Sequence, residues 1–147
     1  MVMLELSNFL HFVGLAFGLG GATIAVIISS KAEKDEDVNR AMIKIMPSIS
    51  KLIGLGLVLL IISGVGILLY VEWPLDRQML LVKHVLVAWI VIVGIIIGKG
   101  MKKMKMSAPK GKEKPSAEFL KAKKKIRAFS RLNLILWCLV TVLSVFV

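Results

Sequence analysis

The sequence predicts an all-α integral membrane protein, a four-helix bundle with both termini on the extracytoplasmic side. Hydrophobic residues make up 57% of the 147 residues, and the mean hydropathy is +0.84. That is more apolar surface than a soluble domain of this size can bury. The apolar residues fall into four long runs, and most of the 20 basic residues lie in two of the segments between them. Together these observations predict one domain, residues 1–147, that crosses a membrane four times.

Each apolar run is close to the length of about 20 residues that an α-helix needs to cross the hydrocarbon core. The fourth run has only 16 residues, but it gains a turn if it begins near Ser130, and a small length mismatch costs little. A cleaved signal peptide is the alternative for the first run, but because no basic segment precedes that run we expect a helix. The four predicted spans are 6–29, 52–71, 79–97 and 130–147.

Basic residues predict the orientation, because the loops that carry more lysine and arginine stay in the cytoplasm. The first loop carries five basic residues, and the third loop, 99–131, carries 13. The second loop offers only Arg77. We therefore expect the first and third loops inside, the termini outside, and a multi-pass protein of the cell membrane.

Both basic loops also contain helical patterns. Residues 38–46 are expected to form a short interfacial helix that ends before Pro47, which permits a change of direction. In the third loop, apolar residues recur at helical spacing, so 117–131 is expected to form an amphipathic helix that leads into the fourth span. That apolar face consists of Phe119, Ala122, Ile126 and Phe129.

The two histidines lie at similar depth in the predicted bundle. His11 is six residues beyond Glu5, and His84 is seven residues beyond Arg77, so each lies on the order of 10 Å inside the outer surface. An ionisable residue within a span is expensive unless it faces the bundle interior, which makes both residues candidates for a functional site. Because haem iron accepts axial imidazole, the pair points to haem b, with His11 and His84 as metal ligands.

Flat helix faces continue inward from both histidines. Gly14, Gly18 and Gly21 follow His11 at helical spacing, and the corresponding face of the third helix ends in Gly94 and Gly98. Glycine permits the close approach of a porphyrin or of another helix. The first three glycines are therefore candidates for cofactor binding, with helix packing as the alternative, since both segments contain GxxxG spacings.

Lys83 is a third ionisable residue in this layer, adjacent to His84 and about 100° around the helix from it. Three roles are compatible with its position. It can neutralise a haem propionate, ligate iron if burial deprotonates its amine, or extend outward to the membrane surface.

Two other features have simpler explanations. Met101, Met104 and Met106 suggest a Cu(I) site because thioether sulfur is a soft ligand, but the neighbouring lysines oppose cation binding. We expect instead a frayed helix end whose methionines contact lipid or neighbouring helices. The basic third loop predicts attraction to the lipid bilayer and its anionic headgroups, and it does not require nucleic acid. The sequence identifies no redox partner, and it leaves a homo-oligomer open.

Several segments resemble known membrane protein families. The string LHFVGLAFGLGG, residues 10–21, is similar to the first helix of the copper-resistance protein D family, with His11 before a Gly-Gly pair. The layout also resembles the J-type protoporphyrinogen oxidases, in which a histidine in helix one and a lysine early in helix three match His11 and Lys83. The segment IMPSISKL and the pair Arg131 and Asn133 are similar to that pattern as well.

The resemblance covers most of the chain loosely, with departures in two places. Gly18 replaces the tryptophan usual in the helix-one motif, and Leu134 and Ile135 replace the acidic residue and proline that follow the helix-four asparagine. The resemblance implies the four-helix architecture and b-type haem binding through His11, with His84 or Lys83 as the second ligand.

Three functions follow as hypotheses. The first is a b-type haem protein that transfers electrons, with axial histidines from helices one and three. The second is an enzyme of haem biosynthesis similar to the protoporphyrinogen oxidases, which would depend on His11 and Lys83. The third is a copper-handling or structural membrane protein.

Overall fold

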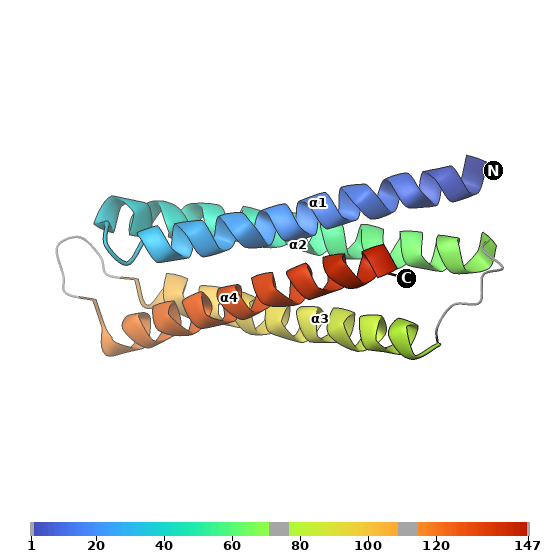
Figure 1. The fold of residues 1–147 in the computed structure, drawn as a ribbon. Helices are drawn as coiled ribbons and strands as arrows, with labels where there is room; N and C mark the ends of the chain where they lie inside the picture. The colour runs from blue at the N-terminus through green and yellow to red at the C-terminus, as the bar shows by residue number, and fades with distance from the viewer. Residues whose placement is uncertain (1, 71–76, 109–114, 147) are drawn as a thin grey trace.

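Four long α-helices make up the fold in the computed structural model, which describes residues 2–70, 77–108 and 115–146 (Figure 1). All four are long and apolar enough to cross a membrane. The predicted all-helical fold of four membrane-length segments is therefore confirmed. The helices are α1 (Val2–Lys31), α2 (Glu36–Tyr70), α3 (Arg77–Met106) and α4 (Ala117–Phe146).

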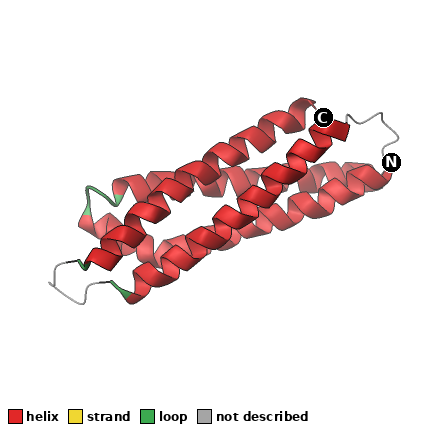
Figure 2. Cartoon of the chain, turned by 90° about the horizontal axis from the view of Figure 1, so that it is seen from below, coloured by secondary structure: helices red, strands yellow, loops and turns green. Residues whose placement is uncertain are grey.

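The helices follow one another around the bundle in chain order. Helix α1 packs most extensively against α2, and α3 packs against α4. Helix α4 also contacts α1, whereas the contact between α2 and α3 is the smallest. Figures 1 and 2 show the helices running roughly along one axis, with both termini at the same end and the α1–α2 turn at the other. Helices α1 and α3 therefore face each other diagonally across the bundle.

Helix α2 is continuous through Pro47, so the expected short helix over 38–46 is not a separate element. Proline removes one backbone donor and crowds the preceding turn, which favours a break. Here the flanking turns are both held by packing, because Met42 and Met46 are 1% exposed and Ile49 is also buried. The prediction was wrong because tertiary contacts outweighed this local effect.

Helix α4 begins at Ala117 and continues without interruption into the fourth apolar run. Phe119, Ala122 and Ile126 on its basic part are buried in the core, with Phe129 packed against them. This confirms the predicted amphipathic helix. It also means that the bundle extends beyond the apolar runs at the basic end.

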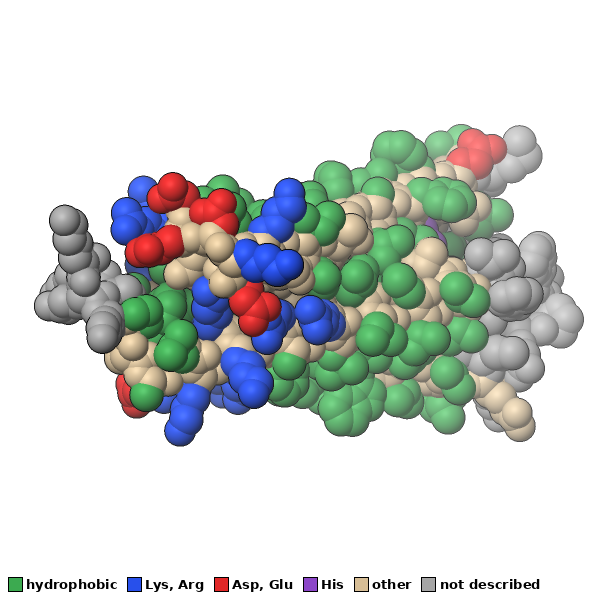
Figure 3. Space-filling model, turned by 60° about the vertical axis from the view of Figure 1, so that its left-hand side comes forward, with side chains coloured by type: hydrophobic (Ala, Val, Ile, Leu, Met, Phe, Trp, Pro, Cys, Tyr) green, Lys and Arg blue, Asp and Glu red, His purple; other side chains and the backbone are tan. Residues whose placement is uncertain are grey.

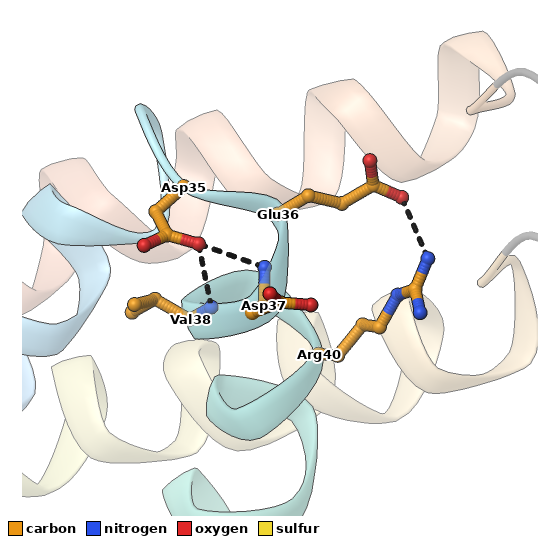
Figure 4. Close-up of polar contacts among 5 residues, drawn as sticks. All are labelled: Asp35, Glu36, Asp37, Val38 and Arg40. Carbon is orange, nitrogen blue, oxygen red and sulfur yellow. Dashed lines mark hydrogen bonds and ion pairs between the residues drawn. The ribbon is translucent and has the colours of Figure 1, made fainter.

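The α1–α2 turn is closed by Asp35, which caps the N-terminus of α2 (Figure 4). The Asp35 Oδ1 atom accepts hydrogen bonds from the backbone N–H groups of Asp37 at 2.9 Å and Val38 at 3.2 Å. These donors belong to the first helical turn and have no partner within the helix. One turn later, Arg40 pairs with Glu36 at 3.1 Å.

Basic side chains of α4 connect this turn to the rest of the bundle. Lys123 Nζ donates to the Ala32 carbonyl oxygen at 2.7 Å, and Arg127 forms an ion pair with Glu33. Figure 3 shows lysine, arginine and most of the acidic side chains in view gathered at this end, while apolar side chains cover much of the surface beyond it. This distribution is the one expected for a bundle whose middle faces lipid.

Candidate functional site

The glycines of α1 lie at the closest approach to α2. A Cβ atom added at Gly14 would come within 2.8 Å of the Gly56 carbonyl oxygen, and one added at Gly56 would come within 2.6 Å of the Gly18 backbone nitrogen. Real Cβ atoms essentially never approach other atoms this closely. Gly14 and Gly56 therefore permit the two backbones to touch, as small residues do in membrane helix pairs.

Side chains fill the rest of this glycine face. The indole ring of Trp137 from α4 lies against Gly18, and Ile53 from α2 lies against Gly21. Helix packing, the alternative given for Gly14, Gly18 and Gly21, accounts for all three. Their assignment to cofactor binding stays a prediction. On the other predicted flat face, a Cβ atom added at Gly94 or Gly98 of α3 would meet no atom of another helix within 4 Å among the residues described.

His11 is half-buried and is held by a chain of two hydrogen bonds to α2. The Ser63 hydroxyl donates its only proton to the Leu60 carbonyl oxygen at 3.0 Å. Its oxygen, 3.1 Å from His11 Nδ1, must then accept a hydrogen bond from the imidazole. The proton of the neutral ring is thus placed on Nδ1, which leaves a lone pair on Nε2. Ser63 is 1% exposed, so water does not compete for this bond.

Lys83 reaches the same part of the bundle from α3. It is half-buried, and its charge acts on His11 even though α1 and α3 are diagonal neighbours. The structure therefore gathers His11, Ser63 and Lys83 from three different helices in one layer near the end that carries the termini. An imidazole held in one tautomer beside an ammonium group can bind a metal or an anionic group, or can exchange a proton.

His84, although adjacent to Lys83 in the sequence, has an exposed side chain. The rotation of about 100° between neighbouring residues accounts for the difference in exposure. Of the two candidates for a second ligand, Lys83 is the more buried. Arg77, used above as the depth marker of α3, has a side chain outside the described part of the structure.

Sequence reasoning missed Ser63, whose importance comes from a contact with a residue 52 positions away. It also missed a polar face on α4, where Ser130, Asn133 and Trp137 are 2%, 3% and 0% exposed. Each carries a buried polar atom without a hydrogen-bond partner among the described residues. The sequence shows that these three residues are three and four positions apart, and therefore on one helix face, but it does not show that this face is buried.

The three methionines that suggested a copper site lie in different environments. Met101 and Met104 are buried in the core, whereas Met106 is 74% exposed. Packing therefore explains two of the three. Within the described residues, no group of three or more histidine, cysteine, aspartate or glutamate side chains is arranged to hold a metal ion. An axial haem ligand needs no such group, because the porphyrin itself supplies four donors to the iron.

In comparisons with known proteins, no family model, curated protein or solved structure matches this chain.

Proposed function

We propose that this chain is a membrane protein that binds b-type haem through His11 and uses it to transfer single electrons. The observation that carries the proposal is the hydrogen-bond chain from the Leu60 carbonyl through Ser63 to His11 Nδ1. Metal-binding histidines are commonly held in this way by a partner of the second ring nitrogen, which sets the tautomer and the ring orientation. His11 Nε2 then has the lone pair that iron requires.

The donor set suits haem iron at this level of the bundle. His11 supplies a neutral imidazole, and Lys83 on the facing helix supplies either a counter-charge for a propionate or an amine ligand. When bound, haem would supply a reversible one-electron couple between ferric and ferrous iron. The protein would supply the axial ligand, its orientation, and an apolar surrounding that limits access of water.

A second candidate function is an enzyme similar to the J-type protoporphyrinogen oxidases. It is favoured by the charge of Lys83, which acts on His11, and by the greater burial of Lys83 than of His84. That family carries a histidine and a lysine in the corresponding helices, so the pair supports the alternative as well as the haem protein. We further propose that the protein resides in the cell membrane with its termini outside, on the strength of its basic loops.

The first test is the absorption spectrum of the purified protein, oxidised and after reduction with dithionite, following expression with adequate haem. We expect haem bands in the wild type and their loss in His11→Ala. Ser63→Ala should lower haem affinity about ten- to hundredfold, because the partner of a ligating histidine is removed. A colourless wild type would refute haem binding.

Matched variants separate the proposals. Ser29→Ala removes a similarly buried hydroxyl, which donates to the Val26 carbonyl oxygen at 3.1 Å and lies 18 residues beyond His11 on α1, and it should leave the spectrum unchanged. Lys83→Gln and His84→Ala then identify the second ligand, since the one that coordinates iron changes the band positions when replaced. Protoporphyrinogen oxidation that requires Lys83 but not His84 would favour the enzyme over an electron carrier.

A further inference from the structure

The basic end of α3 forms one wall of a surface cavity. Lys99, Lys102, Lys103 and Met106 follow the spacing of a single helix face and line a cavity of about 390 Å³. Ser107, just after the end of α3, and Glu118, in the first turn of α4, line the rest. The cavity thus lies between two helices, immediately beyond the continuous apolar run of α3, at the level where lipid headgroups meet a membrane protein.

The charges in this cavity are unbalanced. Lys103 Nζ lies 3.5 Å from Glu118 Oε1. Among the described residues, no carboxylate forms an ion pair with Lys99 or Lys102. Two ammonium groups one helical turn apart are therefore available to a single anion.

A second cavity at the same end of the bundle offers one cation, Lys124, whose side chain has neither an ion pair nor a hydrogen bond among the described residues, instead of two. It measures about 230 Å³ and includes Glu33, Lys123 and Arg127 in its lining. There, Arg127 already pairs with Glu33, and Lys123 donates to the Ala32 carbonyl oxygen. Lys123 and Arg127 thus connect α4 to the α1–α2 turn, whereas no ion pair within the described part of the chain involves Lys99 or Lys102.

An exposed apolar stripe leads to the lysines from the membrane. Ile95 is one helical turn and Ile92 two turns before Lys99, on the same face of α3. Their side chains are 54% and 46% exposed. The surface therefore combines an apolar track within the membrane with paired positive charges at its edge, which matches the two chemical parts of an anionic phospholipid.

We propose that this face of α3 is a binding site for one anionic phospholipid, distinct from the general attraction of the basic loops to the membrane. Lys99 and Lys102 bind its phosphate in the cavity. Its acyl chains lie along Ile95 and Ile92. The bound lipid holds the basic ends of α3 and α4 in register, since both helices line the cavity.

The experiment is native mass spectrometry of the full chain, released from micelles that contain equal amounts of phosphatidylglycerol and phosphatidylcholine with identical acyl chains. The wild type should retain one phosphatidylglycerol in preference to phosphatidylcholine. The variant K99Q/K102Q should lose this retention by on the order of tenfold or more, given the contribution of each basic residue near a lipid surface.

The matched control is K44Q/K51Q, which removes the same charge from exposed lysines of α2 in the other basic segment. It should retain the lipid as the wild type does. Equal losses in the two variants would mean diffuse attraction, and no preference between the two lipids would exclude an anion site; either result overturns the proposal. Inorganic phosphate or glycerol phosphate that competes as well as the intact lipid would show a site for a soluble anion, which also overturns it.

Discussion

At the scale of single residues, helix packing depends on glycines that have no side chain, and the orientation of His11 depends on one hydrogen-bond partner. Gly56 faces the α1 backbone so closely that no side chain fits, whereas a Cβ atom added at Gly54, two residues earlier, would meet no atom of another helix within 4 Å among the residues described. Ser63 similarly matters because a single buried hydroxyl orients His11. The sequence alone does not distinguish Gly54 from Gly56, because both lie in the same apolar run. Their surroundings make one essential to packing and the other not.

We therefore expect Gly56→Ala to destabilise the protein by about 1–3 kcal/mol, the usual cost of overpacking a closely packed interface. Gly54→Ala is the control, and should be neutral or slightly stabilising because alanine favours helix more than glycine. Thermal unfolding in detergent, followed by circular dichroism, measures both. Equal stability of the two variants would contradict the close approach of α1 and α2.

At the scale of elements, helix ends are determined by hydrogen bonds and by packing more than by helix propensity. Helix α2 begins where Asp35 accepts two backbone N–H groups, and it passes through Pro47 because core contacts hold both sides. Helix α4 begins after Ser116, whose hydroxyl oxygen accepts from the Phe119 N–H at 3.2 Å. Capping side chains thus begin two of the helices at the basic end.

Replacing the cap of α2 tests this view. Asp35→Ala should lower stability by about 1 kcal/mol and speed hydrogen exchange at the first turn of the helix, because two backbone donors lose their acceptor. Asp37→Ala removes the same charge from the same turn and serves as the control, since the Asp35 carboxylate is the one that caps. Hydrogen-exchange mass spectrometry of residues 36–40 reports the effect. Unchanged exchange in Asp35→Ala would mean that packing alone sets the start of α2.

At the scale of the whole molecule, the ends of the bundle differ in charge. Both termini lie at one end, and the segments with most of the lysine and arginine lie at the other (Figures 1 and 3). The candidate residues His11, Ser63 and Lys83 belong to the end with the termini, whereas the cavity lined by Lys99 and Lys102 belongs to the basic end. A bound haem and a bound lipid would therefore lie near opposite membrane surfaces.

The positive-inside rule then predicts the orientation in cells. In a background where the single cysteine is replaced by C138S, a membrane-impermeant maleimide should label Val2→Cys on intact cells. Lys34→Cys, in the α1–α2 turn, should react only after the membrane is permeabilised. The opposite pattern would place the termini in the cytoplasm.

The fold class could be predicted because its determinants are local. The hydrophobicity of a run of residues does not depend on the rest of the chain. Four helices long and apolar enough to cross a membrane, and an amphipathic start to α4, were therefore correctly predicted. The candidate site was predicted less completely. His11 and Lys83 could be named, since an ionisable residue in an apolar run is conspicuous. Ser63 could not, because serine is common in such runs and its role depends on a histidine 52 residues away.

Composition and spacing along the chain thus determined the four helices, their membrane-compatible length and hydropathy, and the residues worth testing. Contacts between helices decided the rest: the continuity of α2 at Pro47, the filling of the glycine face by Trp137 and Ile53, and the burial of Lys83 relative to His84. The physical reason is that hydrophobicity and charge belong to a segment, whereas burial, close approach and hydrogen-bond partners belong to pairs of segments and exist only after the helices have packed.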